Sequence, residues 1–202
     1  MTYEKHFKIG STAISVHILS ILSVFALIFA ESSIYSISGI FCAAAHELGH
    51  IAMICFFGAG IREFRFLPFG AEIRMKREVN YSSELIISLA GPLANFVLAA
   101  VMYILFLFFP NPVILFTVIC SIFLAVVNLV PVRGFDGGRM VRCMALSRLE
   151  YEKALKFIKI SEQVSLIILS ALSIAAIRAA AFNISLIIIC LYLFVSVYKN
   201  DY

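Results

Sequence analysis

Long apolar runs separated by short charged segments make up most of the chain. A helix needs about 20 apolar residues to cross the hydrocarbon core of a bilayer. The pattern predicts membrane spans at Ser11–Ala30, Ile37–Phe57, Leu85–Phe109, Val113–Pro131, Ile160–Ala181 and Phe182–Val197. The last two are short, and one long bent helix is the alternative there. We expect the first span to be retained, because it is longer than the apolar core of a signal peptide.

The charged segment between the second and third spans has a different period. Apolar and charged residues alternate on both sides of Pro68-Phe69-Gly70 within residues 60–79. Alternation flanking a turn signal predicts a β-hairpin. Two interpretations remain open: an edge strand that takes up an extended peptide, or an amphipathic lid on the membrane surface. A second charged segment, Ser147–Glu162, is expected to lie on the anionic inner leaflet.

Composition and charge fit a membrane protein with a defined orientation. Hydrophobic residues make up 62% of the 202 residues, charged residues 14%, and the mean hydropathy is +1.02. The net charge of +4 does not indicate nucleic acid, because the basic residues lie between apolar runs. Six spans place every lysine and arginine except Arg178 on one side, which predicts cytoplasmic termini. We therefore predict an all-α polytopic membrane protein, one domain over residues 1–202, with a cytoplasmic β-hairpin.

The second span contains the motif H-E-x-x-H. On a helix, His46 and His50 are separated by one turn, so both face the same side and can bind one zinc ion. Glu47 is adjacent and is positioned to take a proton from activated water. The alternative is two buried histidines that only bond neighbouring helices. Ionisable groups are costly inside a bilayer and are functional by default, which favours the metal.

A catalytic zinc ion needs a third protein ligand. The stretch "NLVPVRGFDGGR", Asn128–Arg139, ends the fourth span with a proline and three glycines, and it contains Asp136. A helix N-cap or turn aspartate in a Gly-rich loop is the structural alternative for this residue. Glu72 and Glu84 are the other nearby carboxylates.

Counting residues along the spans places the histidines and a motif of the third span at a similar depth in the membrane. Counted from the cytoplasmic ends, His50 and His46 lie ~12 and ~18 Å into the membrane, and "GPLAN", Gly91–Asn95, lies ~10–16 Å in. Irregular or polar backbone at this depth must line a cavity or be buried in protein. A small water-filled site near the cytoplasmic face is the simplest explanation.

The five cysteines form no C-x-x-C pair. We interpret them as small buried residues and not as a disulfide framework. Cys42 lies one turn before His46. A packing role is favoured for it over a further metal contact.

Three motifs resemble those of the site-2 protease family of intramembrane zinc metalloproteases. They are H-E-x-x-H at residues 46–50, G-P-x-x-N at 91–95 and N-x-x-P-x-x-x-x-D-G at 128–137. "FLPFGA" and "FDGGR" are similar to the branch typified by stage IV sporulation protein FB. Gly134 and Ile18 stand where that branch tends to have proline. Many members carry a nucleotide-binding CBS domain after the last span, and we expect none in this sequence.

The resemblance implies a set of residue roles. Asp136 would be the third ligand to one Zn²⁺ per chain, Glu47 the general base, and Asn128 a contact to the substrate backbone. Asn95 and Pro131 are further candidates for substrate binding.

The resemblance also implies a substrate class and a location. The reaction would be hydrolysis of a membrane-tethered protein near the cytoplasmic face of a bacterial cell membrane, for example a pro-sigma factor in sporulation. Membrane partners that inhibit or activate the enzyme, and an oligomer, are compatible with it. Two alternatives are a metal-ion transporter and an inactive relative that binds membrane partners. A transporter predicts polar residues through the full membrane depth, and an inactive relative has no use for Glu47.

Overall fold

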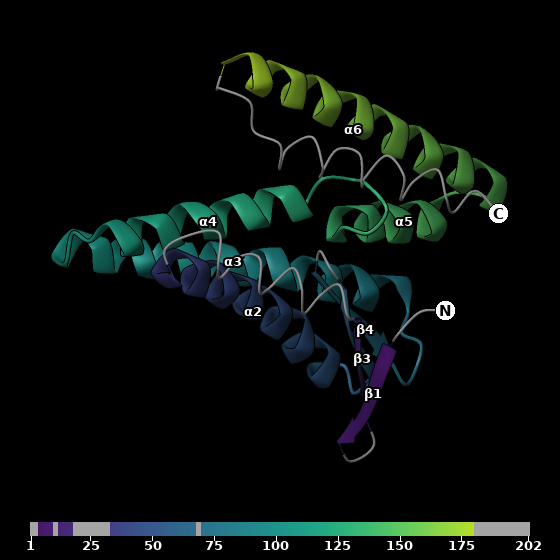
Figure 1. Cartoon of the computed structure of the whole chain (residues 1–202). Helices are drawn as coiled ribbons and strands as arrows, with labels where there is room; N and C mark the ends of the chain where they lie inside the picture. The colour runs from purple at the N-terminus through teal and green to yellow at the C-terminus, as the bar shows by residue number, and fades with distance from the viewer. Residues whose placement is uncertain (1–3, 10–11, 18–32, 68–69, 180–202) are drawn as a thin grey trace. The chain divides into compact units, whose positions relative to one another are not determined.

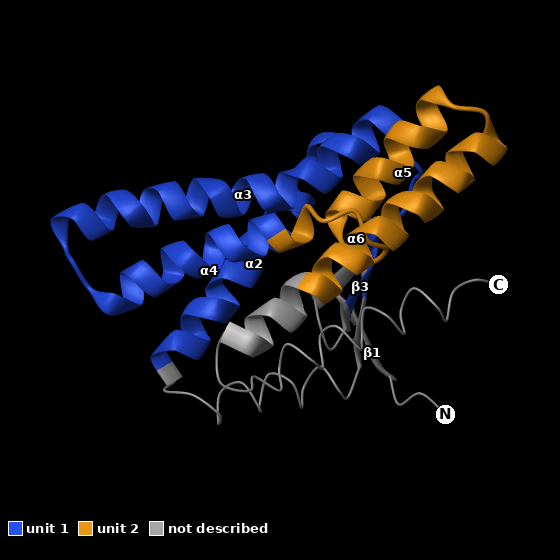
Figure 2. Cartoon of the chain, turned by 90° about the horizontal axis from the view of Figure 1, so that it is seen from above, with its two compact units in different colours: residues 1–126 blue, residues 127–202 orange. Residues whose placement is uncertain are grey.

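The computed structural model of the chain describes residues 4–9, 12–17, 33–67 and 70–179 (Figure 1). Within these ranges the elements follow the order β1 (Glu4–Ile9), β2 (Thr12–His17), α2 (Ser33–Phe56), β3 (Ile61–Leu67), β4 (Gly70–Met75), α3 (Tyr81–Phe108), α4 (Pro112–Asn128), α5 (Asp136–Arg148) and α6 (Tyr151–Ala179). They group into two compact units, residues 1–126 and 127–202 (Figure 2). That the chain forms one domain stays a prediction.

The predicted hairpin is confirmed, and it belongs to a larger sheet. β3 and β4 pair antiparallel, with Phe64 opposite Ile73. The sheet has four strands in the order β1-β2-β3-β4, and β2 pairs with β3 in parallel. Pro68 and Phe69, the predicted turn residues, lie outside the described residues.

The predicted start of the first span at Ser11 is wrong. Residues 12–17 form β2, which pairs with β1 on one side and β3 on the other. The physical reason is local: Thr12, Ile14 and Val16 are β-branched and alternate along the strand, a pattern that suits a sheet. The rest of that predicted span, from Ile18, lies outside the described residues.

Helices α2 and α3 are held together by close backbone contact. Gly49 of α2 lies so near α3 that an added Cβ would collide with the carbonyl oxygen of Ala90 and lie 2.8 Å from Cβ of Ala94. Small residues at such crossings let helices approach closely inside a membrane. This approach brings the second half of α2 beside the start of α3.

The connection from α2 to the sheet depends on two glycines. Gly58 and Gly60 have φ of 64° and 65°, a region that favours glycine. They turn the chain from the end of α2 into β3. A small apolar cluster joins Ala59 of this turn to Ile54 of α2 and Ile87 of α3, and Ile61 and Ile73 of the sheet pack against it.

Two described helices, α2 and α3, are long and apolar enough to cross a membrane. Helix α4 is apolar but has 17 residues. The apolar side chains are largely exposed: Leu107, Phe108 and Phe109 are 62, 72 and 67% accessible. A continuous apolar exterior of this kind is typical of a lipid-facing surface, because a soluble protein would bury it.

The second unit contains α5 and α6. Ala145 of α5 packs against Ala154 and Ile158 of α6, and Arg133 pairs with Glu162 at 3.5 Å. α6 begins within the predicted surface segment and continues into the predicted fifth span as one helix. The predicted sixth span, Phe182–Val197, lies outside the described residues.

Candidate metal centre

His46 and His50 lie one turn apart on α2 and are both 6% exposed. Their ring centroids are 4.8 Å apart, and the rings are nearly perpendicular, at 78°. Both rings are enclosed because α3 packs closely against this face of α2. The predicted geometry of the two histidines is therefore present.

The protonation of His50 follows from its contact with α3. Its Nδ1 lies 2.7 Å from the carbonyl oxygen of Ile87. A carbonyl oxygen only accepts hydrogen bonds, so Nδ1–H donates and the remaining ring nitrogen, Nε2, carries a lone pair. A bond of this kind at the second ring nitrogen is the usual way in which a protein orients a metal-binding histidine.

His46 is oriented by Asn95 of α3. The amide nitrogen of Asn95 lies 3.3 Å from Nδ1 of His46, and its Oδ1 is buried with no partner among the described residues. The oxygen and nitrogen of an amide are assigned by their bonds and exchange when the group is turned by 180°. With the amide turned, Oδ1 accepts from Nδ1–H of His46. Asn95 then orients His46 as the Ile87 carbonyl orients His50.

Both histidines consequently aim an Nε2 lone pair at the same point. The two Nε2 atoms are 3.2 Å apart. Two lone pairs at this distance repel unless a cation lies between them. Tetrahedral zinc with Zn–N bonds of 2.0–2.1 Å would separate its ligand nitrogens by about 3.3 Å. The pair therefore fits two corners of a zinc site.

Gly91 shapes the space in front of the rings. A Cβ at this position would collide with Nε2 of His50 and lie 2.7 Å from Nε2 of His46. Any other residue would fill the point at which the lone pairs converge. Gly91 is part of the "GPLAN" motif, which gives this motif a physical role.

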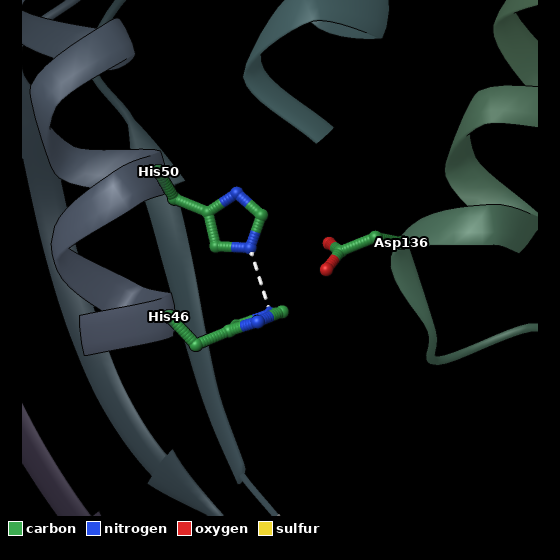
Figure 3. Close-up of side chains that lie close together, drawn as sticks. All are labelled: His46, His50 and Asp136. Carbon is green, nitrogen blue, oxygen red and sulfur yellow. Dashed lines mark hydrogen bonds between the residues drawn. The ribbon is translucent and has the colours of Figure 1, made fainter. Parts of the chain in front are cut away.

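Asp136 begins α5 in the second unit and is 7% exposed. The glycines around it fit the chain path: Gly134 has φ of 97°, and a Cβ on Gly137 would collide with the carbonyl oxygen of Leu129. The ligand atoms of His46, His50 and Asp136 all lie within 4.8 Å of one another (Figure 3). Two imidazoles and a carboxylate are a donor set typical of catalytic zinc.

The structure also locates the other residues that the sequence predicted for the site. Glu47 follows His46 on α2 and is half-buried. Asn128 is the last residue of α4 and Pro131 lies in the following turn, both half-buried. Glu84 lies in the first turn of α3 and is not a member of the three-residue group. Glu72 lies in β4, opposite Arg65.

The sequence reasoning missed the positioning groups. It predicted a substrate contact for Asn95, which stays a prediction; the structure adds that this side chain is 0% exposed and contacts His46. It named Gly91 only as part of the "GPLAN" motif, and it did not identify the Ile87 carbonyl. The signal for Gly91 and Asn95 was the depth of "GPLAN", which matched the depth of the histidines.

The family model described as "Peptidase family M50" matches residues 34–114 and 109–172. The chain belongs to peptidase family M50. The predicted resemblance to site-2 proteases is thereby confirmed. The matched region contains the two histidines, Glu47, "GPLAN" and Asp136.

Relatives of this M50 chain agree with the assignment. It is 29% identical to zinc metalloprotease MJ0392 of Methanocaldococcus jannaschii over 204 residues, which cover 93% of this chain and 57% of the relative. It is 33% identical to stage IV sporulation protein FB of Bacillus subtilis (strain 168) over 124 residues, 54% of this chain and 39% of the relative. The chain thus spans about half the length of the curated relatives it matches.

A solved structure extends the agreement to the fold. The site-2 protease from Methanocaldococcus jannaschii matches with a TM-score of 0.69 and 25% identity, over 99% of this chain and 96% of that one. The predicted six spans are not all confirmed, since two described helices meet the criteria for a span.

Proposed function

We propose that the chain is an intramembrane zinc metalloendopeptidase. The observation that carries the proposal is the pair of Nε2 atoms 3.2 Å apart, each on a ring whose Nδ1 is occupied by a bond from α3. Relatives named as a zinc metalloprotease and a site-2 protease support it. Asp136 is proposed as the third ligand, on the basis of its buried carboxylate.

Each residue has a defined task in this proposal. When bound, zinc supplies Lewis-acid activation of water and of the peptide carbonyl. His46 and His50 hold their Nε2 lone pairs in place through Asn95 and the Ile87 carbonyl. The Glu47 carboxylate accepts the proton of the attacking water and delivers it to the departing amine nitrogen.

The substrate proposed is a membrane-tethered protein cut near the cytoplasmic face. Its backbone must first unwind, because carbonyls in a helix are already bonded. β4 ends the strand order of the sheet, which supports it as a strand to which an extended substrate segment is added. Asn128 and Pro131 are proposed to contact the substrate backbone where α4 ends.

The membrane topology, the substrate and the membrane partners are proposed from the sequence and its similarity to known proteins. Six spans with both termini in the cytoplasm are proposed from the distribution of lysine and arginine. The match to a sporulation protein supports a pro-sigma factor as the first substrate to test. Inhibitory or activating membrane partners belong to the same proposal.

The test is co-expression with candidate tethered pro-proteins, comparing the wild type with Glu47→Gln. Glutamine keeps the size of the side chain but cannot accept the proton. Zinc content should stay near wild type, while cleavage should fall by at least ~10²-fold. Glu84→Gln is the matched control and should cut normally. Undiminished cleavage by Glu47→Gln with zinc still bound would rule out this mechanism.

A further inference from the structure

One helical turn from the candidate metal centre, the first unit buries a further reactive group between α2 and α4. Cys42 of α2 is 0% exposed and lies one turn before His46. Its thiol donates to the carbonyl oxygen of Thr117 at 3.6 Å, and its sulfur accepts from the hydroxyl of Ser121 at 3.2 Å. Both partners belong to α4.

These contacts bring a second thiol to the same place. Cys120 lies between Thr117 and Ser121 in sequence, and residues three and four apart share one helix face. The Cys120 side chain lies close enough to Cys42 for the two thiols to interact. Two thiols far apart in sequence therefore meet between two apolar helices.

The two thiols differ in access. Cys42 is fully buried, whereas Cys120 is partly exposed on α4. Helix α4 is apolar, and its exposed residues include Phe123 at 63% accessibility. Cys120 is therefore the thiol that a small apolar oxidant would meet first.

We propose that Cys42 and Cys120 form a redox-sensitive disulfide site that reacts with lipid-soluble organic hydroperoxides. The Cys120 sulfur attacks the peroxide, the O–O bond breaks, an alcohol leaves and Cys120 becomes a sulfenic acid. The Cys42 sulfur then attacks the Cys120 sulfur, the S–S bond forms and water leaves. Two thiols are oxidised, one hydroperoxide is reduced, and the thiol protons end in the alcohol and the water.

The disulfide would join α2 to α4 covalently. In the reduced protein these helices also meet at Tyr35 and Phe116, whose ring centroids are 5.1 Å apart. A cross-link between distant residues also restricts the unfolded chain. The oxidised protein should therefore unfold at a higher temperature than the reduced protein.

The experiment treats the full chain in lipid vesicles with cumene hydroperoxide and maps its thiols by differential alkylation and peptide mass spectrometry. The Cys55→Ser background removes an exposed cysteine that would react alone. The expected result is paired loss of both thiols, a peptide joining Cys42 to Cys120, and recovery of both with dithiothreitol. The unfolding temperature should rise on oxidation and return on reduction.

A matched variant tests the order of the steps. In Cys42→Ser, Cys120 should stop at a sulfenic acid that a dimedone probe traps, and no cross-link should form. Cys143→Ser, at a buried cysteine of α5, should retain the cross-link. The proposal is overturned if wild-type Cys120 oxidises while Cys42 stays alkylatable, if either thiol pairs elsewhere, or if neither reacts.

Discussion

The amide of Asn95 lies 3.3 Å from Nδ1 of His46, across the interface between α3 and α2. Asn95 is fully buried, so its first partner is the histidine and not solvent. The contact links a motif in the third predicted span to a candidate metal ligand in the second. It explains why a polar residue occupies a position at which a bilayer would favour an apolar one.

Replacing Asn95 tests its role as a positioning residue. Asn95→Ala removes the acceptor for Nδ1–H of His46, and zinc affinity should fall by about 10–100-fold. Asn95→Asp keeps an acceptor and should retain most of the affinity. Competition with a chromophoric chelator measures both. Equal losses in the two variants would mean that the residue only fills space.

Gly91→Ala places a methyl group against both imidazoles. The rings must move apart or turn, so zinc affinity should fall by about tenfold or more, a loss at least as large as that expected for the orienting bonds. Gly39→Ala is the matched control, because no atom lies within 4 Å of a Cβ there. Metal content by mass spectrometry, with thermal unfolding as a check on folding, gives the comparison. Normal zinc binding by Gly91→Ala would contradict the close contact.

Asp136→Ala tests the third ligand. Loss of one anionic ligand should weaken zinc binding and abolish most cleavage, while His46→Ala or His50→Ala should each lose most of the metal. Zinc per chain and cleavage are measured on the same preparations. If Asp136→Ala kept full zinc and full cleavage, the third ligand would be sought elsewhere, beginning with Glu72.

Reporter fusions test the orientation derived from charge. Fusions at Tyr202 and within residues 58–84 should both report the cytoplasm. A fusion at Asn111, between α3 and α4, should report the opposite side. An external signal from Tyr202 or from the 58–84 loop would overturn the six-span arrangement.

The sequence predicted those features that depend only on residues close together along the chain. The spacing of His46 and His50 requires only a helix, and the alternation around Pro68-Phe69-Gly70 requires only a hairpin, so both were readable from sequence. The partners of the histidines were not, because Ile87 and Asn95 belong to another helix. A backbone carbonyl such as that of Ile87 also leaves no trace in side-chain chemistry.

The N-terminal strands were missed for a related reason. Residues 12–17 are apolar enough to continue into a hydrophobic run, and only pairing with β3 makes them a strand. That pairing joins segments separated by the whole of α2. Hydropathy reports the solvent preference of a segment but not its hydrogen-bonding partner. The predicted first span therefore began at Ser11 and included residues that form a strand.

The parallel pairing of β2 with β3 restricts how many times the chain can cross the membrane between these two strands. Strands of one open sheet must share one compartment, since sheet edges are not tolerated in the hydrocarbon. Every departure from that compartment between His17 and Ile61 therefore needs a return. We therefore predict an even number of crossings in this interval. A short ladder of backbone bonds thus constrains membrane topology independently of charge.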